Sequence, residues 1–324
     1  MLQKIAGAAR ATGSLCAASI ALAACSASQP QTGLPAATAL QGSARQTTSG
    51  DLLYAGAKHD VVVYSYPDGG SAGSFKTPGL IRGMCSDAGG DVFIAAFKEK
   101  GGAFTGFVSE YAHGGTAPIA TLALPQGKTP IACSSDPTSG DLAVTVENPS
   151  NHASSVAIYA GAAGTPAILK NRNIGALPQL GYDASGNLFV TSGSNAGAIL
   201  AKGSNAFTAV TFGELLGVVG HVQWDGTAFA LQTFAARRTG RERVQERIFR
   251  LTISGSTGTI VGQSHLLGWR VRDGGQSWIE GDTLLATPDN RILFWPYPQG
   301  GEPSKALHPA TPTQAITVSA GASR

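Results

Sequence analysis

Short apolar segments, each introduced by a small polar turn, recur along the chain from Gly50 onward. Each turn begins with Gly followed by Asp, Asn or Thr. The copies are Gly50-Asp51-Leu52-Leu53, Gly90-Asp91-Val92-Phe93, Gly140-Asp141-Leu142-Ala143, Gly186-Asn187-Leu188-Phe189, Gly226-Thr227-Ala228-Phe229 and Gly281-Asp282-Thr283-Leu284. Small polar residues that bound short apolar runs indicate strands joined by tight turns. The pattern therefore predicts an all-β domain.

A tyrosine followed by a glycine turn is a second repeated marker. Tyr66-Pro67-Asp68-Gly69-Gly70 recurs as Tyr111-Ala112-His113-Gly114-Gly115 and Tyr297-Pro298-Gln299-Gly300-Gly301, and more loosely at Tyr159. The marker tyrosines Tyr66, Tyr111 and Tyr159 lie 45 and 48 residues apart, and the 138 residues from Tyr159 to Tyr297 are three steps of 46. A repeat of about 46 residues matches a four-stranded propeller blade. We therefore expect a six-bladed β-propeller of four-stranded antiparallel blades over residues 49–320.

The two ends of this region predict how the ring closes. Ile316–Val318 forms a first strand with no blade after it, whereas Leu52–Ala55 forms a second strand with no first strand before it. An open ring would leave an unpaired edge strand. We expect these two segments to pair, and a frayed C-terminal tail is the alternative.

The first 24 residues have the layout of a secretory signal. Lys4 and Arg10 precede a run of small and apolar residues over 11–24 that is too short to cross a bilayer. The run ends in Leu22-Ala23-Ala24-Cys25, which resembles a bacterial lipobox, in which the Cys is lipidated and becomes the mature N-terminus. An ordinary signal peptide with an incidental Cys25 is the alternative.

These features predict the organisation of the N-terminal region and the location of the protein. We expect a lipoprotein signal peptide over residues 1–24, a lipidated Cys25, and a flexible tether over residues 25–48, which are rich in Ser, Ala, Gln, Thr and Pro. Ser26, a residue other than Asp after the Cys, resembles the sorting signal for the outer membrane. The membrane is thus an expected partner, through the lipid anchor.

The repeats and the lipobox together carry a resemblance. The chain resembles six-bladed β-propeller lipoproteins of bacteria, of the kind grouped with NHL-repeat, YncE-like and streptogramin-lyase-like propellers. The resemblance covers residues 50–319 and specifies the fold better than the function. Streptogramin lyases and gluconolactonase-like propellers are the enzymes that it suggests, and it implies for them a metal held by acidic or His side chains at the ring axis.

The amino-acid composition excludes some classes of protein and of binding partner. Hydrophobic residues make up 43% of the chain and charged residues 13%, which excludes wholesale disorder. The 43 glycines among 324 residues favour strands and turns over long exposed helices. A net charge of +3 is too small to indicate nucleic acid. We expect a monomer without a cofactor.

Candidate catalytic chemistry is sparse. The six histidines fall at different positions of different predicted blades, and no two of them form a His-x-x-x-His pair: His59, His113, His152, His221, His265 and His308. The Asp-rich turns 87–91 and 136–141 lack the ligand spacing of a calcium loop, so we interpret them as turn formers.

We therefore predict no catalytic residue and no metal site. The favoured function is a non-catalytic envelope module that binds a glycan, peptide or protein. The alternatives are a metal-dependent lyase or hydrolase of the streptogramin-lyase or gluconolactonase-like type, and a structural envelope part without a discrete ligand.

Cys85 and Cys133 are the only cysteines of the predicted propeller, in the first strands of adjacent blades. An envelope location permits a disulfide. Equivalent positions of adjacent first strands are expected to exceed the Cα separation of about 7 Å that a disulfide tolerates. We favour two buried, unbonded cysteines, and the disulfide stays open as the alternative.

Charge is predicted to sort by face, with strands A to D of a blade numbered from the axis outward. The A–B and C–D turns, on one face, carry Asp87, Asp91, Asp136, Asp141, Asp183, Asp225 and Asp282. The B–C and D–A connections, on the other, carry Lys98, Lys100, Lys128, Arg172, Arg237, Arg238, Arg241, Arg270, Arg272 and Arg291. We expect an anionic glycan or protein nearest Arg237, Arg238, Arg241, Arg270 and Arg272. A solvated hairpin over 237–247 is the alternative.

Overall fold

The computed structural model describes residues 50–191, 195–213, 218–234, 246–269, 275–288 and 290–321, all within the folded unit Ala44–Arg324. This part of the chain is almost entirely strand and turn. Its one helix is the 3₁₀ turn η1 (Ala160–Ala162). Over the same residues there is accordingly no helix with the length and apolar character needed to span a membrane. Cys25 lies outside the described residues.

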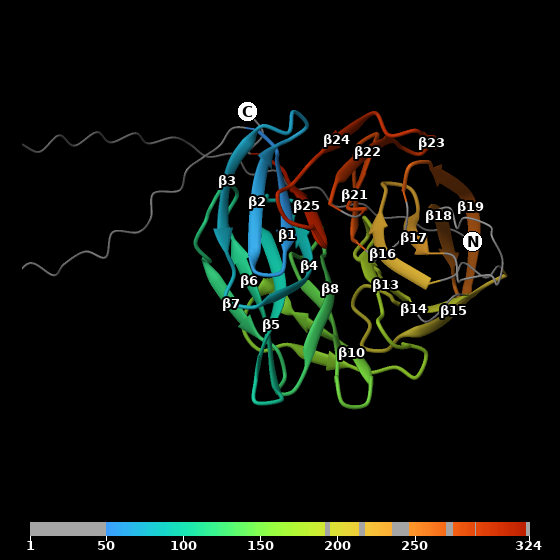
Figure 1. Cartoon of the computed structure of the whole chain (residues 1–324). Coiled ribbons are helices and arrows are strands. Elements are labelled where there is room, and N and C mark those ends of the chain that lie inside the picture. The colour runs from blue at the N-terminus through green and yellow to red at the C-terminus, as the bar shows by residue number, and fades with distance from the viewer. Residues whose placement is uncertain are drawn as a thin grey trace, which may run out of the picture. The chain divides into compact units, whose positions relative to one another are not determined.

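Four sheets contain four antiparallel strands each and follow one another like the blades of a propeller (Figure 1). In spatial order, the first is β25 (Ala315–Ser319), β1 (Leu52–Ala57), β2 (Asp60–Ser65) and β3 (Ser71–Lys76). The second is β4 (Leu80–Ser86), β5 (Val92–Lys100), β6 (Ala103–Tyr111) and β7 (Ala120–Ala123). The third is β8 (Thr129–Ser135), β9 (Leu142–Glu147), β10 (Ser154–Tyr159) and β11 (Ala167–Leu169). The last is β20 (Ser277–Glu280), β21 (Thr283–Ala286), β22 (Ile292–Pro296) and β24 (Lys305–Leu307).

The remaining strands form one nine-stranded sheet rather than two separate sheets. One half is β12 (Leu180–Tyr182), β13 (Leu188–Thr191), β14 (Ala196–Leu200) and β15 (Thr208–Phe212). The other half is β16 (Val218–Trp224), β17 (Phe229–Phe234), β18 (Glu246–Ser254) and β19 (Thr257–Leu266), with β23 (Gly300–Gly301) paired to β19. A short parallel pairing of the outer strands joins the halves, Thr211 opposite Thr257 and Phe212 opposite Gly258. The repeat period therefore predicted the propeller-like arrangement of four-stranded antiparallel units, but not this shared edge.

The C-terminal strand pairs with the first strand of the domain as predicted. In β25 and β1, Val318 lies opposite Leu53, and Ile316 lies opposite Ala55. Beyond these strands, the Gly321 N–H donates to Asp51 Oδ1 at 2.9 Å. The two ends of the described domain thus lie side by side.

The tyrosines of the repeated marker pack each four-stranded sheet against the sheet before it. Two do so through aromatic contacts: Tyr111 with Phe75 (ring centroids 4.7 Å apart) and Tyr66 with Phe294 (6.5 Å). Two do so through hydrogen bonds donated by the hydroxyl: Tyr159 to Ala123 O at 2.9 Å and Tyr297 to Asp225 Oδ2 at 2.7 Å. The tyrosines whose spacing gives the repeat period are therefore residues that hold neighbouring sheets together.

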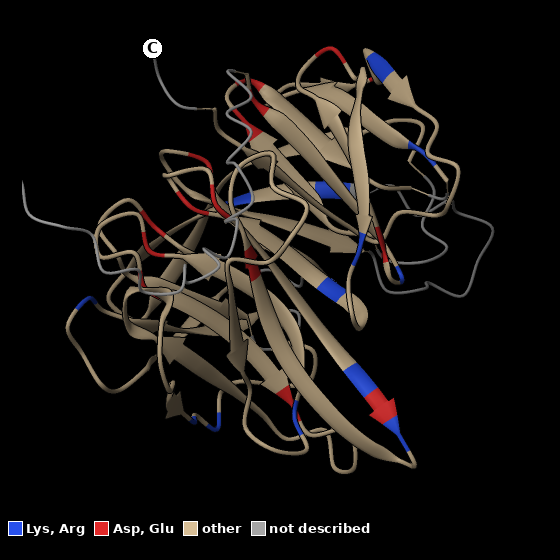
Figure 2. Cartoon of the chain, turned by 90° about the vertical axis from the view of Figure 1, so that its left-hand side faces the viewer, with Lys and Arg blue, Asp and Glu red and all other residues tan. Residues whose placement is uncertain are grey.

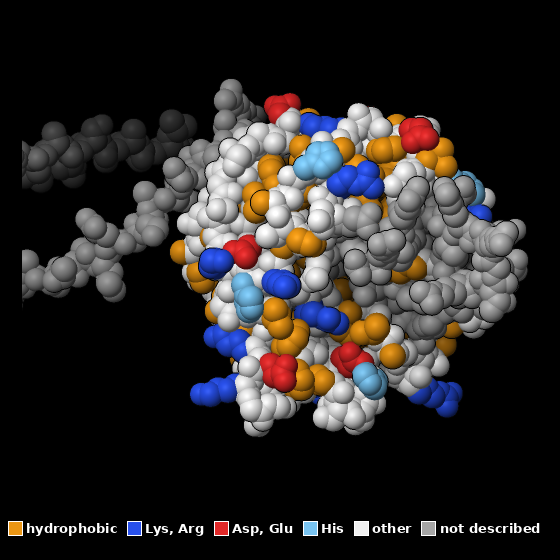
Figure 3. Space-filling model, in the orientation of Figure 1, with side chains coloured by type: hydrophobic (Ala, Val, Ile, Leu, Met, Phe, Trp, Pro, Cys, Tyr) orange, Lys and Arg blue, Asp and Glu red, His pale blue; other side chains and the backbone are white. Residues whose placement is uncertain are grey.

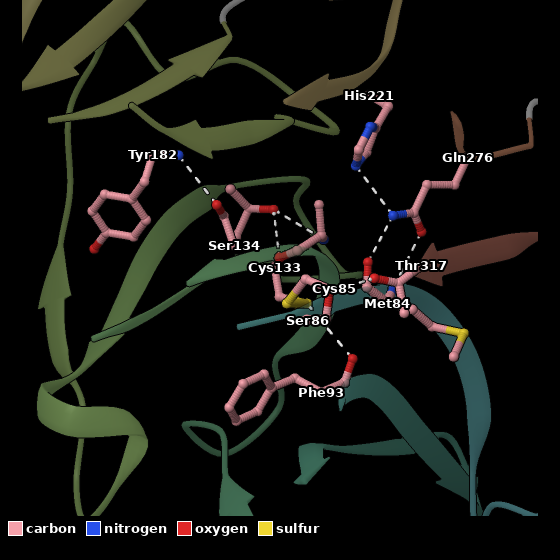
Figure 4. The surroundings of a disulfide bond; sticks show 12 residues. Met84, Cys85, Ser86, Phe93, Cys133, Ser134, Tyr182, His221, Gln276 and Thr317 are labelled. Carbon is pink, nitrogen blue, oxygen red and sulfur yellow. Dashed lines mark hydrogen bonds between the residues drawn. A yellow bond between two sulfur atoms is a disulfide. The ribbon is translucent and has the colours of Figure 1, made fainter. Parts of the chain in front are cut away.

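Cys85 in β4 and Cys133 in β8 form a disulfide, with their Cα atoms 5.8 Å apart (Figure 4). The favoured prediction of two unbonded cysteines is wrong. The first strands of neighbouring sheets approach more closely than we expected, because Gly83 has no side chain at the contact. A Cβ atom on Gly83 would lie 2.9 Å from the backbone oxygen of Ile131. This close approach brings the two cysteines within the distance that a disulfide requires.

Candidate binding site at the axis

The first strands contact one another in a ring around the axis, in the order β25, β4, β8, β12, β16, β20 and back to β25. Figure 4 shows the links near the disulfide. Most of the links are hydrogen bonds: Ser86 Oγ to Val318 O (2.6 Å), Tyr182 N to Ser134 Oγ (3.1 Å), Ile279 N to Gln223 Oε1 (2.7 Å) and Gln276 N to Gln314 O (3.0 Å). The disulfide joins β4 to β8, and Gly181 of β12 lies against Val222 of β16. Side-chain and backbone bonds therefore fix the spacing of these strands.

The links also show that the first strands run in the same direction. Ser86 and Val318, Cys85 and Cys133, and Ser134 and Tyr182 each pair positions near the C-terminal ends of their strands. We call the face where β4, β8, β12, β16, β20 and β25 begin the start face, and the face where they end the end face. The start face carries the B–C and D–A connections, and the end face carries the A–B and C–D turns.

A cavity of about 330 Å³ opens at the start face, and we call it the bulge cavity. The beginnings of all six first strands, together with the end of β17, contribute to its wall: Ile81, Arg82, Gly83, Ile131, Ala132, Leu177, Gln179, Val219, Gly220, His221, Phe234, Gln276 and Gln314.

Three β-bulges at corresponding positions shape this cavity. In β4, β8 and β16 the register shifts so that Arg82, Ile131 and Gly220 have no residue opposite them on the second strand. All three line the bulge cavity. A bulge takes the extra residue out of the hydrogen-bond ladder and is over-represented beside functional sites.

Buried threonines on the second strands satisfy the first-strand backbone beside the bulge cavity. Thr145 Oγ1 accepts from Ala132 N–H at 3.1 Å and donates to Ala132 O at 3.4 Å. Thr191 Oγ1 makes the same two contacts with Gln179, at 2.9 and 3.3 Å. Each threonine stands five residues after the Gly of its polar turn, Gly140 or Gly186. Sequence reasoning missed this signal, because the threonines lie inside apolar segments.

His221 and Gln276 form the floor of the bulge cavity. Gln276 spans the backbone of Met84, accepting from its N–H at 3.1 Å and donating to its oxygen at 2.7 Å. The same amide nitrogen lies 3.1 Å from His221 Nε2. Burial lowers the pKa of His221 to about 4, so the ring is neutral at pH 7. Because the Gln276 nitrogen can only donate, His221 Nε2 is the acceptor and the ring proton lies on Nδ1.

Among the described residues, basic side chains predominate at the start face, and Figure 3 shows Lys and Arg spread over the side of the molecule that it presents. They are Lys58, Lys76, Arg82, Lys98, Lys100, Lys128, Lys170, Arg172, Arg247 and Arg291. Many of the Asp and Glu residues lie in turns along another side of the molecule (Figure 2). Arg237, Arg238, Arg241, Arg270 and Arg272 lie outside the described residues.

Arg82 is the basic residue of the bulge cavity, and sequence reasoning missed it. It is the extra residue of the β4 bulge, its side chain is exposed, and it lines the bulge cavity. Nothing in the run Leu80-Ile81-Arg82-Gly83 distinguishes a bulge from a regular strand, because the bulge depends on how β4 meets its neighbours at the axis.

The acidic turns are turn formers, as we interpreted them. Asp136 accepts hydrogen bonds from Thr138 N and Oγ1 and from Ser139 Oγ, at 2.7–2.8 Å. Desolvation opposes ionisation of Asp136, but these hydrogen bonds and the charge of Lys202 lower its pKa overall. Within the described ranges, His, Cys, Asp and Glu side chains form no group of three or more that could hold a metal ion.

Comparisons with known proteins support the fold. No family model matches the chain, and no curated protein matches it either. A protein of unknown function from Bacteroides caccae is 11% identical, with a TM-score of 0.57 over 84% of this chain and 99% of its own. A functionally unknown protein from Desulfotomaculum acetoxidans is 9% identical, with a TM-score of 0.51 over 83% and 99%. Apo AztD from Citrobacter koseri is 10% identical, with a TM-score of 0.49 over 85% and 98%. The two similarities with a TM-score above 0.5 concern the fold alone.

Proposed function

We propose that this chain is a non-catalytic binding module, a six-bladed β-propeller lipoprotein of the bacterial envelope that holds an anionic glycan or protein on its start face. In this interpretation the two halves of the nine-stranded sheet are two blades that share an outer edge. The observation that carries the proposal is the bulge cavity, where three corresponding bulges surround an opening with Arg82 at its wall.

The lining of the bulge cavity suits recognition by hydrogen bonds and charge. The polar residues Gln179 and Gln314 are part of the lining. Arg82 supplies a cation whose planar guanidinium carries several N–H donors and matches carboxylate groups. The links among the first strands hold the wall in place, so little conformational entropy is lost when a ligand binds. Basic residues over the rest of the start face would attract an anionic partner from a distance of about one Debye length.

Binding titrations with defined probes test the ligand class. We expect oligogalacturonate, an acidic oligosaccharide, or a poly-Glu peptide to bind, and neutral maltotriose to bind at least about tenfold more weakly. Arg82→Gln should weaken binding of the acidic probe by about tenfold and reduce its salt dependence, because one charge contact is lost. Lys202→Gln, on the end face, is the matched control. Equal binding of acidic and neutral probes, or equal affinity of both variants, would reject the proposal.

Replacing Arg237, Arg238, Arg241, Arg270 and Arg272 by Ser tests the wider start face. With the same acidic probe, we expect a lower association rate and a shallower salt dependence than in the parent protein. If the association rate and its salt dependence do not change, residues 237–247 have no role in binding and the alternative of a solvated hairpin is supported.

The envelope location is tested at Cys25. We expect Cys25→Ser to leave the precursor uncleaved or to release the protein from the membrane fraction, because the acyl chains would have no attachment site. Fractionation and immunoblotting measure both effects, with Cys16→Ser in the signal segment as the control. Unchanged processing and membrane retention of Cys25→Ser would contradict lipidation.

A further inference from the structure

A second cavity, of about 240 Å³, lies at the end face, and we call it the indole cavity. Its lining residues include the aromatic Trp224, Trp278 and Tyr182 and the acidic Asp87 and Asp183. His221 lines both this cavity and the bulge cavity, so it stands between them. The aromatic and acidic groups come from β12, β16 and β20 and from the turns after β4 and β12, so the tertiary fold brings them together.

The Trp224 indole carries an unused hydrogen-bond donor. Its Nε1 is buried, and no acceptor for it exists among the described residues. By contrast, Trp278 Nε1 donates to Glu280 Oε2 at 3.2 Å. A buried donor without an acceptor destabilises a fold unless water or a ligand supplies one. Trp224 is a lining residue of the indole cavity, so an oxygen atom of a ligand bound there would supply the missing acceptor.

The carboxylates of the indole cavity have no basic side chain beside them among the described residues. Asp87 Oδ1 accepts from Asp91 N–H at 2.8 Å, and both carboxylate oxygens of Asp183 accept from Asn187, its N–H and its side-chain amide, at 2.8–2.9 Å. These bonds orient the carboxylates but leave their negative charge in place. Burial, and then the charges of Asp91 and Asp87, raise the pKa of nearby Glu110, as expected where negative potential is not neutralised.

The basic residues of the end face are engaged elsewhere. Arg250 Nε pairs with Asp225 Oδ2 at 2.6 Å. Lys202 Nζ donates to Thr138 Oγ1 at 2.7 Å, and Lys305 Nζ donates to the backbone oxygens of Pro67 and Asp68 at 2.6–2.7 Å. Within the described part of the chain, these are the Lys and Arg residues of this face. A cation for the indole cavity must then come from outside the chain.

From this arrangement we propose that the indole cavity binds an organic ammonium group, carried by a small molecule that also offers an oxygen acceptor. A cation over the face of Trp is attracted by the negative potential of the ring, and Trp gives the strongest such interaction. Asp87 and Asp183 add charge attraction, and Trp224 Nε1 fixes the oxygen. The site lies on the face opposite to the bulge cavity, so tests of the two sites can succeed or fail independently.

The test uses pairs of probes that differ in charge alone or nearly so. Choline is compared with its uncharged isostere 3,3-dimethylbutan-1-ol, and glucosamine with glucose, by titrating the indole fluorescence of the full chain in detergent. We expect saturable binding of choline or glucosamine, at least about tenfold tighter than the neutral partner. A preference for choline indicates an alkylammonium ligand, and a preference for glucosamine indicates an amino sugar. Equal binding within both pairs, or no saturable binding of either cation, would overturn the proposal.

Variants assign the binding to this cavity. Asp87→Asn with Asp183→Asn should weaken binding of the cation by at least about tenfold, while the amide oxygens still accept the backbone N–H bonds of the turns. Trp224→Phe should also weaken it, because the N–H is lost. Asp282→Asn changes an end-face turn outside the cavity and is the matched control. Circular dichroism and the melting temperature confirm folding, and unchanged cation binding in the double variant would place the ligand elsewhere.

Discussion

His221 is a buried histidine whose neutrality is part of the structure. Its Nε2 accepts from Gln276, which in turn bonds both backbone groups of Met84, so the uncharged ring belongs to the contact between β16 and β4. Protonation would place a charge at the axis and replace the acceptor by a second donor.

Stability should therefore depend on pH through His221. Its pKa is about 4 when folded, against 6.5 for an ordinary histidine, so the unfolded chain binds the proton first. Stability is complete above about pH 6.5 and falls as the pH decreases toward 4, by about 2 kcal/mol between pH 7 and 5. Urea unfolding at both pH values measures the loss. His221→Gln keeps an acceptor without a titrating group, and should lose clearly less. An equal loss in both proteins would show that His221 does not titrate as proposed.

At the level of the strands, the hydrogen bonds of two repeated tyrosines predict which of them contributes more to stability. Tyr297 donates to Asp225, a carboxylate that also accepts from Arg250, whereas Tyr159 donates to a neutral backbone oxygen. Hydrogen bonds to charged groups contribute about 1.5–3 kcal/mol and neutral ones about 1 kcal/mol. Tyr297→Phe should therefore destabilise the domain more than Tyr159→Phe in denaturant unfolding. The reverse order would contradict this assignment.

The disulfide ties β4 to β8 across a loop of 48 residues. A crosslink of this span stabilises by about 4 kcal/mol in the chain-entropy description, within an observed range of about 2–5 kcal/mol. Replacing Cys85 and Cys133 together by Ala should lower the free energy of unfolding by an amount in that range. Guanidinium titration of both proteins without reductant measures it. A change below about 1 kcal/mol would mean that the axial hydrogen bonds alone fix the two strands.

The strands could be predicted because the sequence signals for strands and turns are local. The contacts between strands around the axis could not be predicted, because they depend on how separate sheets meet. Gly-Asp turns and tyrosines repeat in the sequence and revealed the antiparallel units. The strands without partners at the two ends of the domain revealed the pairing of β25 with β1. The disulfide was missed because it depends on how closely Gly83 lets β8 approach. The bulge at Arg82 and the pairing of β15 with β19 also depend on contacts between sheets, which no single segment encodes.

The whole domain depends on its last strand. β25 supplies the first strand of its sheet, and Ser86 and Gln276 bond to residues 318 and 314. Deleting residues 311–324 should lower the melting temperature by several degrees or prevent folding, because β1 becomes an unpaired edge and the ring of links opens. Deleting only residues 322–324 is the control and should have little effect. If both truncated proteins melt like the full chain, β25 is dispensable.

The hydrogen bond from Gly321 N–H to Asp51 shows that the two ends of the described domain lie on the same face. Chain entry at Gly50 and chain exit at Gly321 both belong to the end face, where β25 finishes and β1 begins. Anything that holds the protein by either terminus, whether an anchor, a tag or a fused domain, pulls on that face. The start face lies opposite both points of attachment. A biosensor coupled through either end would leave the bulge cavity accessible and crowd the indole cavity.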